Sequence, residues 1–273
     1  MADKEEDSPK IGLIAGEGEF PLILAKELLN SKYRIVAVTF SKTQEKKLQD
    51  LVDKVFRIYI GQFQKLIDIF KQEGIRDLIF LGKIEKSLAL RFSLPDKRAL
   101  TLWNRVSNRE DNTLLKAVAD ELEREGFRVR GPSEFLKKFL AEEKIYTKRV
   151  PSEREWEDIH YGLKIARAIG ELDIGQCVVV KNKMTVAVEA MEGTDATILR
   201  GGKIMPQTVV VKIAKPHQDL RLDLPVVGFD TIEVLIKARA SILALEAGKT
   251  FFLQQEKAIE LADKYHLCIV GVR

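Results

Sequence analysis

The sequence lacks several features that would place it in a narrow class of protein. No apolar run approaches the roughly 20 residues that a membrane-spanning helix needs, so we expect a soluble, cytoplasmic chain. The chain has only two cysteines, Cys177 and Cys268, and each lies in an apolar run. This pattern predicts buried reduced thiols and excludes a disulfide scaffold. The histidines show no metal-ligand spacing, which argues against a zinc site.

Neither sign of charge dominates, and no repeat or low-complexity segment is present. The 45 Lys and Arg residues against 41 Asp and Glu residues leave a net charge of +4, too balanced to predict a nucleic-acid partner. The first ten residues, MADKEEDSPK, are polar and predict no signal peptide. A chain of 273 residues that is 45% hydrophobic can bury one large core or two modest ones.

Short apolar runs alternate with amphipathic segments in the first half. The runs predict strands at 10–16, 34–40, 55–60, 76–83 and 127–131. Helices are expected at 19–31, 42–52, 63–74 and 111–126, and the stretch 87–106 is expected to be helical or irregular. Because strands that alternate with helices form parallel βαβ units, residues 1–131 are predicted to be a Rossmann-like N-terminal domain.

Gly131-Pro132 and a charged stretch follow, which predict a linker over 132–151. Residues 152–273 are expected to form a C-terminal α/β catalytic domain. Its predicted elements are a helix at 152–172 with a Ser152/Glu155 capping box, a hairpin at 177–190 turning at Asn182-Lys183, strands at 208–215, 251–254 and 267–272, and helices at 230–250 and 256–266. Gly248 is expected to close the helix over 230–250. The fold class is α/β: a Rossmann-like parallel-sheet N-terminal domain plus a distinct mixed α/β C-terminal domain.

A glycine-rich turn, IAGEGEFP, joins the first predicted strand to the first helix. Gly16, Glu17 and Gly18 would lie at the carboxyl edge of the sheet, where nucleotides bind to α/β folds. Pro21 replaces the third glycine of a dinucleotide fingerprint, so we expect a nucleotide or sugar phosphate there, or else a simple tight turn. Lys83, after the fourth strand, would lie at the same edge and meet a phosphate, or else be an ordinary solvated lysine.

A cluster of acids follows the hairpin in VEAMEGTDATILRGG, residues 188–202. Either Thr194 or Asp195 is placed to cap the helix that begins in ATILR. Such a cap leaves Glu189 and Glu192 beside the same turn, and clustered carboxylates repel unless a cation compensates them. Oxygen-rich clusters of this kind are what magnesium binds, with water and phosphate oxygens completing its shell.

A second cluster lies in KIAKPHQDLRLDLPVVG, residues 212–228. If this segment is extended, Asp219, Arg221 and Asp223 alternate onto one face, which would be poor core material. The arrangement favours a metal and phosphate site in which acids hold metal or activate water and cations bind phosphate oxygens. A solvated edge strand with its own ion pairs is the plain alternative. The candidate phosphate-binding residues are Lys212, Lys215 and Gln218.

Four stretches together carry a resemblance to a known family. IGLIAGEGEFP, GQCVVVKNKMTVAVEAMEGTDA, the KP-x-QD-x-R-x-D-x-P-x-x-G pattern and SILALEAG resemble the I-type UDP-2,3-diacylglucosamine pyrophosphatases of lipid A biosynthesis. The similarity runs in the same order over nearly the whole chain. His217 departs from the pattern, and LRFSLPDKRAL matches no family motif.

This resemblance implies an activity and a set of roles. The family's enzymes hydrolyse UDP-2,3-diacylglucosamine to 2,3-diacylglucosamine 1-phosphate (lipid X) and UMP, with water attacking the α-phosphorus. They require a divalent cation, usually Mg2+, and bind the lipid between two domains. The essential aspartate maps to Asp223, with Asp219 as the near alternative, and Glu192 to Asp195 match the family's EGTDA box.

We therefore expect Asp223 to position the metal or water, helped by Asp219 and Arg221. Glu189, Glu192 and Asp195 would complete the metal network as a second wall facing the Asp219–Asp223 segment. The expected partners are the nucleotide lipid, lipid X and the inner-membrane surface through peripheral contact. Nucleic acid is not expected, and the sequence leaves open whether the chain forms a homo-oligomer.

Two other classes of function compete with this reading. A non-catalytic nucleotide-sugar or lipid-binding module would use the glycine turn and need no metal, but it would not require two acid clusters. An NAD-type oxidoreductase is disfavoured by Pro21 and by VTFSK after the second strand, which offers no acid for a ribose.

Overall fold

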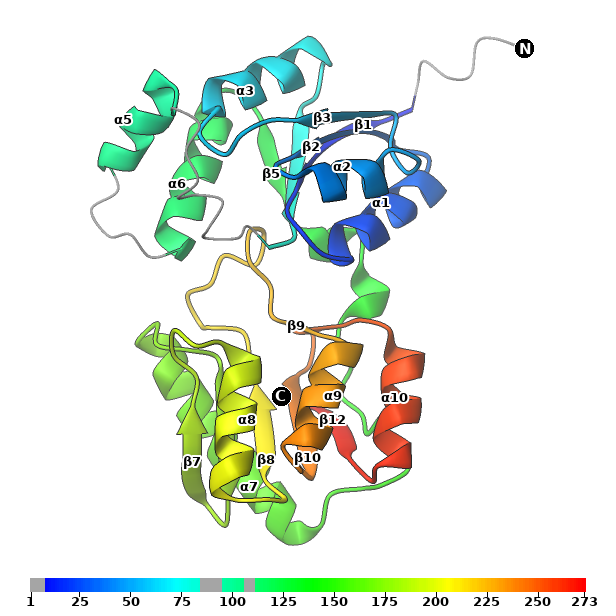
Figure 1. Ribbon diagram of the computed structural model, residues 1–273, viewed down its shortest axis with the longest axis vertical. Coiled ribbons are helices and arrows are strands. Elements are labelled where there is room, and N and C mark those ends of the chain that lie inside the picture. Colours follow the sequence, from blue (N-terminus) through cyan, green and yellow to red (C-terminus); the bar gives the residue numbers. More distant parts are fainter. Residues whose placement is uncertain (1–7, 84–94, 106–110) are drawn as a thin grey trace. The chain divides into compact units, whose positions relative to one another are not determined.

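The computed structural model describes residues 8–83, 95–105 and 111–273 (Figure 1). The chain divides into two compact units. Unit 1 consists of Met1–Lys137 together with the short segment Asp219–Asp223, and unit 2 consists of Lys138–Gln218 and Leu224–Arg273. The assignment of Asp219–Asp223 to unit 1 was not anticipated, because the predicted boundary placed this segment in the C-terminal domain.

Unit 1 is built around a five-stranded sheet in which every strand pair is parallel. Its strands are β1 (Lys10–Ala15), β2 (Arg34–Thr39), β3 (Lys54–Arg57), β4 (Asp77–Leu81) and β5 (Arg128–Arg130), in the order β3-β2-β1-β4-β5. The helices described are α1 (Phe20–Asn30), α2 (Lys42–Leu48), α3 (Phe63–Gln72), α5 (Lys97–Arg105) and α6 (Asp111–Arg124). The strand order reverses between β1 and β4, as in doubly wound folds, and the predicted Rossmann-like architecture is confirmed.

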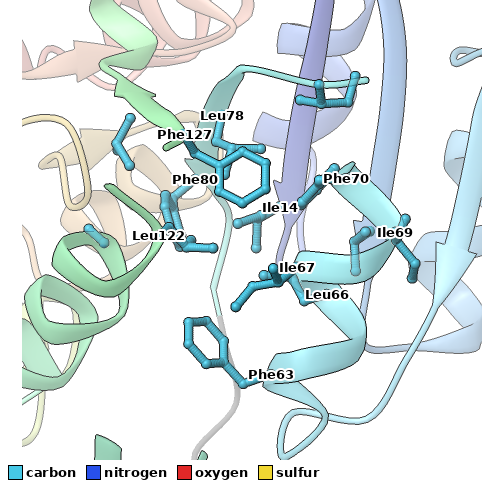
Figure 2. Close-up of a cluster of buried hydrophobic side chains, with 14 of the residues drawn as sticks. Ile14, Phe63, Leu66, Ile67, Ile69, Phe70, Leu78, Phe80, Leu122 and Phe127 are labelled. Atoms are coloured by element: carbon cyan, nitrogen blue, oxygen red, sulfur yellow. The ribbon is translucent and has the colours of Figure 1, made fainter. Parts of the chain in front are cut away.

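The core of unit 1 explains why its helices form where they do. Apolar residues of α3 recur at helical spacing, and the side chains of Phe63, Leu66, Ile67 and Phe70 are buried. Figure 2 shows these side chains gathered with those of β4 and α6 into one cluster. The rings of Phe70 and Phe127 meet edge to face, with centroids 6.3 Å apart.

Unit 2 contains a mixed five-stranded sheet in the order β12-β10-β8-β6-β7. Its strands are β6 (Cys177–Lys181), β7 (Met184–Val188), β8 (Val209–Lys212), β10 (Ile242–Glu246) and β12 (Cys268–Val272), and β9 (Val226–Val227) pairs separately with β11 (Phe251–Phe252). The helices are α7 (Glu153–Glu171), α8 (Thr194–Ile204), α9 (Phe229–Lys237) and α10 (Gln255–Lys264). β6 is antiparallel to β7 and β8, so the carboxyl ends of β7, β8, β10 and β12 lie at one edge.

The predicted start of α7 and the predicted hairpin are both confirmed. Ser152 caps α7, and Glu155 completes the capping box by accepting from the Ser152 amide at 2.9 Å. Asn182 and Lys183 adopt positive φ values of 51° and 57°, the backbone that a two-residue turn of this twist requires. Their amides donate to the carboxylate of Asp158 at 3.0 and 2.6 Å, so α7 holds the turn.

The prediction of one helix over 230–250 is wrong. The helix α9 ends at Lys237, Arg239 has a φ of 55°, and Ile242–Glu246 form β10 in the middle of the sheet. No glycine or proline marks the break, and Leu, Ala and Glu are good helix formers. A strand buried on both faces reads as a continuous apolar run, which periodicity cannot distinguish from a buried helix. Gly248 therefore follows a strand, with a φ of 77°.

The segment predicted as a linker, 132–151, contains ordered structure. Two short 3-10 helices, Pro132–Glu134 and Lys137–Phe139, span the change from unit 1 to unit 2. Beyond them the Tyr146 ring packs on Phe252 with centroids 5.3 Å apart. The buried Thr147 hydroxyl accepts from the Ile269 amide at 3.0 Å. Proline and charge suggested a connector, but residues 132–137 are part of unit 1 and residues 138–151 are part of unit 2.

Candidate active site

The glycine turn of unit 1 and Lys83 share one edge of the sheet, as predicted. The Gly16 amide donates to the Leu81 carbonyl at 2.8 Å, which ties the turn after β1 to the end of β4. Glu17 and Lys83 exchange backbone hydrogen bonds of 2.7 and 3.0 Å. The turns that flank the reversal of strand order are therefore bonded to each other through their backbones, and Lys83 is exposed.

Both glycines in this contact are required by close packing of the backbone. A Cβ on Gly16 would lie 2.6 Å from the carbonyl carbon of Gly82. Gly82 itself has a φ of 100°, and a Cβ there would lie 2.7 Å from Cγ of Pro21. The tight-turn explanation thus accounts for Gly16 and Gly82. Gly18 has open space around it, and only its φ of 108° favours glycine there.

The segment from Asp219 to Asp223 is a turn, and the prediction of an extended strand is wrong. The amides of Leu222 and Asp223 both donate to the Asp219 carbonyl, at 2.9 and 3.1 Å. The Asp219 carboxylate also accepts from the Arg221 amide at 3.0 Å, a local bond that aspartate commonly makes in turns. Asp219, Arg221 and Asp223 therefore do not alternate on one face of a strand.

Arg221 is occupied by two carboxylates of unit 1. Its guanidinium donates to both oxygens of Asp219, at 3.0 and 2.8 Å, and to Glu123 of α6 at 2.8 Å. The hydrogen bond from Arg221 lowers the pKa of Asp219, and Asp219 in turn raises the pKa of Arg221. Leu222 packs on the core of unit 1. Arg221 thus anchors the turn, while Asp223 at its end is exposed.

A buried charged network forms at the carboxyl edge of the unit 2 sheet. Glu189 follows β7 and Lys212 ends β8, and both are almost fully buried, with 6% of each residue exposed. The Thr194 hydroxyl joins them, because Lys212 Nζ donates to it at 3.1 Å and it donates to Glu189 Oε1 at 3.0 Å. Two buried opposite charges are therefore linked through one neutral hydroxyl.

Thr194 does not cap α8, contrary to one of the two capping predictions, and neither does Asp195. Gly193, with a φ of 82°, occupies the N-cap position, and no side chain caps the helix. Asp195 lies exposed in the first helical turn, and the structure shows no hydrogen bond or ion pair between its carboxylate and any described residue. The Thr194 hydroxyl is instead committed to Glu189 and Lys212.

Glu192 is engaged in stabilising the loop that carries it. Its carboxylate accepts from the Ala190 amide at 3.1 Å, the Thr197 hydroxyl at 3.3 Å and Arg200 at 2.5 Å. Its pKa is lowered, first by a hydrogen bond from its own backbone amide and then by Arg200. These contacts give Glu192 a structural role that needs no metal ion.

The charged and polar side chains of the loop after β8 are likewise engaged by neighbouring residues. Lys215 Nζ pairs with Asp173 at 2.6 Å, and the Gln218 side chain accepts from the Lys215 amide at 3.1 Å. His217 lies 2.7 Å from Glu171. Among the described residues, no recorded bond joins Lys215 to the residues that contact Lys212. Gln218 stabilises the conformation of the loop.

Sequence reasoning missed one residue of this edge, Glu246. It ends β10, next to β8, and is buried with 7% exposed. Its carboxylate accepts from the Ala214 amide at 2.9 Å and from Lys249 at 2.8 Å. The residue was hidden because the prediction placed it inside a helix; a strand over ILALE would have put a carboxylate at the edge that carries Lys212.

The described residues offer no ready-made cage for a metal. Within them, no group of three or more His, Cys, Asp and Glu side chains lies close enough to hold an ion. Magnesium does not need such a cage, because it is often held by one or two carboxylates with waters and substrate phosphates. Exposed carboxylates such as Asp195 and Asp223 suit that mode, so the predicted metal requirement stays a prediction.

Comparison with known proteins supplies the family. The model of the LpxI N-terminal domain matches residues 10–139, and the model of the LpxI C-terminal domain matches residues 142–270. The UDP-2,3-diacylglucosamine pyrophosphatase LpxI of Caulobacter vibrioides is 32% identical over 283 residues, which cover 96% of this chain and 97% of that protein.

Similar solved structures are far more distant. The glycinamide-RNase-transformylase T of Mycobacterium tuberculosis is 12% identical with a TM-score of 0.27, covering 67% of this chain and 44% of its own. The ADP complex of N5-carboxyaminoimidazole synthetase from Staphylococcus aureus is 13% identical with a TM-score of 0.25, covering 77% and 68%. Likeness at this level supports no inference. The two domain matches and the full-length relative establish that the chain belongs to the LpxI family.

Proposed function

We propose that this chain hydrolyses the pyrophosphate bond of UDP-2,3-diacylglucosamine, a step of lipid A biosynthesis, and releases lipid X and UMP. The observation that carries the proposal is the relative of that activity, which aligns with 96% of the chain. Both family domains are present in order, so the two parts of such an enzyme are present together. The chain is accordingly assigned as a hydrolase of a phosphoanhydride bond.

Asp223 is the carboxylate we assign to the attack of water on the α-phosphorus. Its competitor Asp219 has both oxygens occupied by Arg221, which makes it a positioning residue for the turn. Asp223 lies at the end of that turn and is exposed. A carboxylate near the reacting phosphorus can orient water and accept its proton. Arg221 is then a positioning residue that holds the turn, and it is not assigned to bind phosphate.

Within unit 2, Lys212 is the cation we assign to phosphate binding, because it is held rigidly. Its ammonium has one partner in Thr194 and one in the Val226 carbonyl, at 3.1 Å each, both of them neutral. A buried ammonium with neutral partners retains its attraction for an anion such as a pyrophosphate oxygen. Glu189 partly offsets that charge through Thr194, and this limits the cost of burying Lys212.

We further propose a need for Mg2+, held by Asp223 or Asp195 with water and substrate oxygens. When bound, the ion supplies charge neutralisation for the phosphoryl group. Glu192 is a poorer candidate because Arg200 and two further donors already engage it. The described part of the chain has no helix that is long and apolar enough to cross a membrane, and contact with the bilayer surface is proposed because the substrate is amphiphilic.

The test is hydrolysis in oxygen-18 water followed by phosphorus NMR, with Mg2+ or EDTA. We expect UMP and lipid X only with Mg2+, with the heavy oxygen on UMP. Asp223→Asn should lower the rate at least about 100-fold, the scale on which a proton-transfer group contributes. Asp50→Asn, at an exposed turn after α2, is the matched control and should keep the wild-type rate.

Other results would revise the assignment in distinct ways. Near-normal hydrolysis by Asp223→Asn would remove its role, and Asp219→Asn would then be tested next. Heavy oxygen on lipid X would reject attack on the α-phosphorus. Binding of the nucleotide lipid without turnover by the wild-type chain would favour the non-catalytic binding module.

A further inference from the structure

The helix α5 of unit 1 packs on α3 and α6 and presents apolar side chains to solvent (Figure 1). Of its nine residues, only Leu102 is buried, and it joins the core of the unit together with the partly buried Ala99. On a different side of the helix, Leu100 is 47% exposed and Trp103 is 46% exposed. Residues three apart are neighbours on a helix, so these two side chains form one stripe with the exposed Lys97. We call Lys97, Leu100 and Trp103 the α5 face.

The start of α5 is anchored by Asp96. Its Oδ1 accepts from the Ala99 amide at 2.8 Å, and its Oδ2 accepts from the Gln64 amide of α3 at 2.7 Å. The Asp96 amide itself donates to the Gly61 carbonyl at 2.9 Å. A side chain that accepts from the first helical turn stabilises the helix, and this one also joins α5 to α3. The α5 face is therefore exposed on an anchored helix.

Positive charge is in excess on and around α5. The helix carries Lys97, Arg98 and Arg105 and no acid. Two carboxylates of α6, Glu121 and Glu125, pair with a larger set of cations: Arg98, Arg105, Arg124 and Lys71. The structure records no ion pair between Lys97 and any described residue, and the carboxylate of Asp96 is engaged by amides. This side of unit 1 therefore attracts anions.

An exposed tryptophan with leucine and lysine on one helix is typical of helices that lie in a membrane interface. The indole ring suits the boundary between headgroups and acyl chains, and a lysine side chain reaches the lipid phosphates. The excess of cations adds attraction for an anionic bilayer. Two apolar side chains are too few for a stable protein partner, which needs about 800 Å2 from each side. A weak and reversible contact with lipid suits the α5 face better.

Exposed apolar side chains of unit 2 have a different charge setting. Leu172 and Ile174, after α7, are also exposed. They flank Asp173 and follow Glu171, and Asp173 pairs with Lys215 at 2.6 Å. That stretch has acids beside its apolar groups and no excess of cations, so it is a poorer match for anionic lipid.

We propose that the α5 face docks this protein on a bilayer that contains anionic lipid. Trp103 and Leu100 lie at the headgroup boundary in this arrangement, and Lys97 lies against lipid phosphates. The choice of a bilayer rests on the proposed function, because an enzyme for a diacylated substrate has to reach the membrane. The α5 face takes no part in bond breaking.

The first measurement is co-sedimentation of the full-length protein with vesicles of phosphatidylcholine, either alone or with about 30% phosphatidylglycerol. We expect binding to the anionic vesicles, and we expect it to weaken as salt rises. Leu100→Gln combined with Trp103→Gln should weaken it at least about 10-fold, because the apolar contact is lost while glutamine keeps the helix. Lys97→Gln should weaken it about 5-fold.

The matched control is Ile204→Gln combined with Lys203→Gln on α8 of unit 2. Ile204 is 62% exposed and follows an exposed lysine, so it too combines an aliphatic side chain with a cation on a helix. This variant should bind vesicles like the wild type. Circular dichroism should be the same for all variants, because every changed side chain is exposed.

A second measurement reports on the α5 face without changing it. Trp103 and Trp156 are the two tryptophans of the chain, so Trp156→Phe leaves Trp103 as the single indole. Lipids brominated in the acyl chain should quench its fluorescence when the protein binds anionic vesicles, because the ring lies at the chain boundary. A folding defect of an altered α5 cannot produce this result.

Four results would overturn the proposal. Equal binding to vesicles with and without phosphatidylglycerol would remove the role of charge. Vesicle binding without quenching of Trp103, or a loss of binding in the α8 control as large as in the α5 variant, would place the contact elsewhere. A wild-type dimer in analytical ultracentrifugation that the α5 variant loses would assign the face to a second copy of the chain.

Hydrolysis of the nucleotide lipid separates this proposal from the proposed function. The α5 variants should turn over substrate in detergent micelles at the wild-type rate and lose turnover of substrate held in vesicles. Unchanged turnover from vesicles would defeat the docking face alone. Absence of wild-type turnover in both settings, with binding to anionic vesicles intact, would defeat the proposed function alone.

Discussion

The two units organise their charged residues in opposite ways. In unit 1 the Asp219–Asp223 turn is held by Arg221 in ion pairs whose side chains remain partly exposed. In unit 2 Glu189 and Lys212 are buried and do not touch, since Thr194 lies between them. Exposed pairs are screened by water and salt, whereas buried charges are screened much less. Unit 2 should therefore respond far more strongly to loss of a charge, and unit 1 to salt and pH.

The largest effect is expected for Lys212→Met. It leaves Glu189 buried without its cation and the Val226 carbonyl without a donor. We expect the free energy of unfolding of unit 2 to fall by about 3 kcal/mol, as for other buried charges that lose a partner. Urea denaturation followed by fluorescence measures it, and the exposed Lys203→Met on α8 is the control, with a change below about 0.5 kcal/mol.

Adding Glu189→Gln to Lys212→Met sharpens the test. If the two charges compensate each other through Thr194, the double variant should be more stable than Lys212→Met alone, because no unpaired buried charge remains. Simple addition of the two costs would show that Glu189 and Lys212 act independently.

The next effect concerns the glycine contact of unit 1. Gly16→Ala would place a Cβ 2.6 Å from backbone atoms of both Gly82 and Lys83, which cannot move aside as a flexible side chain could. We expect a loss of about 2–3 kcal/mol. Gly18→Ala meets nothing within 4 Å but must adopt a φ of 108°, and should cost about 1 kcal/mol. Equal losses in thermal denaturation would contradict the clash.

A smaller effect, with a defined pH dependence, is expected at Arg221. Arg221 lowers the folded-state pKa of Asp219 below its ordinary value of 3.8. The resulting stabilisation is present above that value and is lost as the pH falls through the lower folded-state pKa. Arg221→Gln should therefore reduce the stability of unit 1 by about 1 kcal/mol at pH 7 and by less at pH 3.

Salt is the second variable for this pair. The difference between Arg221→Gln and the wild type should shrink in 1 M sodium chloride, because the side chains are partly exposed. A difference that is constant from pH 7 to pH 3 would show that Arg221 stabilises the turn by packing, and not through Asp219.

The smallest effect is expected for Glu192→Gln. The amide oxygen can still accept from the Ala190 amide, and the NH2 group that replaces the other oxygen can donate to the Thr197 hydroxyl, so the variant loses chiefly the pair with Arg200. We expect about 0.5 kcal/mol, the value of an exposed pair, and hydrolysis near the wild-type rate. A loss of activity above about 10-fold would instead return Glu192 to the reacting site as a metal ligand.

The strands and helices of unit 1 could be predicted because each one carries a local signal. Buried parallel strands read as short apolar runs, and glycine or polar turns separate them from amphipathic helices. The Asn182-Lys183 turn and the Ser152 cap are equally local. β10 could not be found in this way, because Ile242–Glu246 is compatible with either a helix or a strand, and only its neighbours β8 and β12 decide between them.

By itself, the sequence determined the α/β class, the family and the residue types at the candidate site, since these depend on periodicity and on motifs that are contiguous in the chain. Tertiary structure alone decided that Asp219–Asp223 belongs to unit 1 and that Arg221 pairs with Glu123. It also placed Glu246 beside Lys212. The physical reason is that burial and pairing arise between residues far apart in the chain, and no local pattern records them.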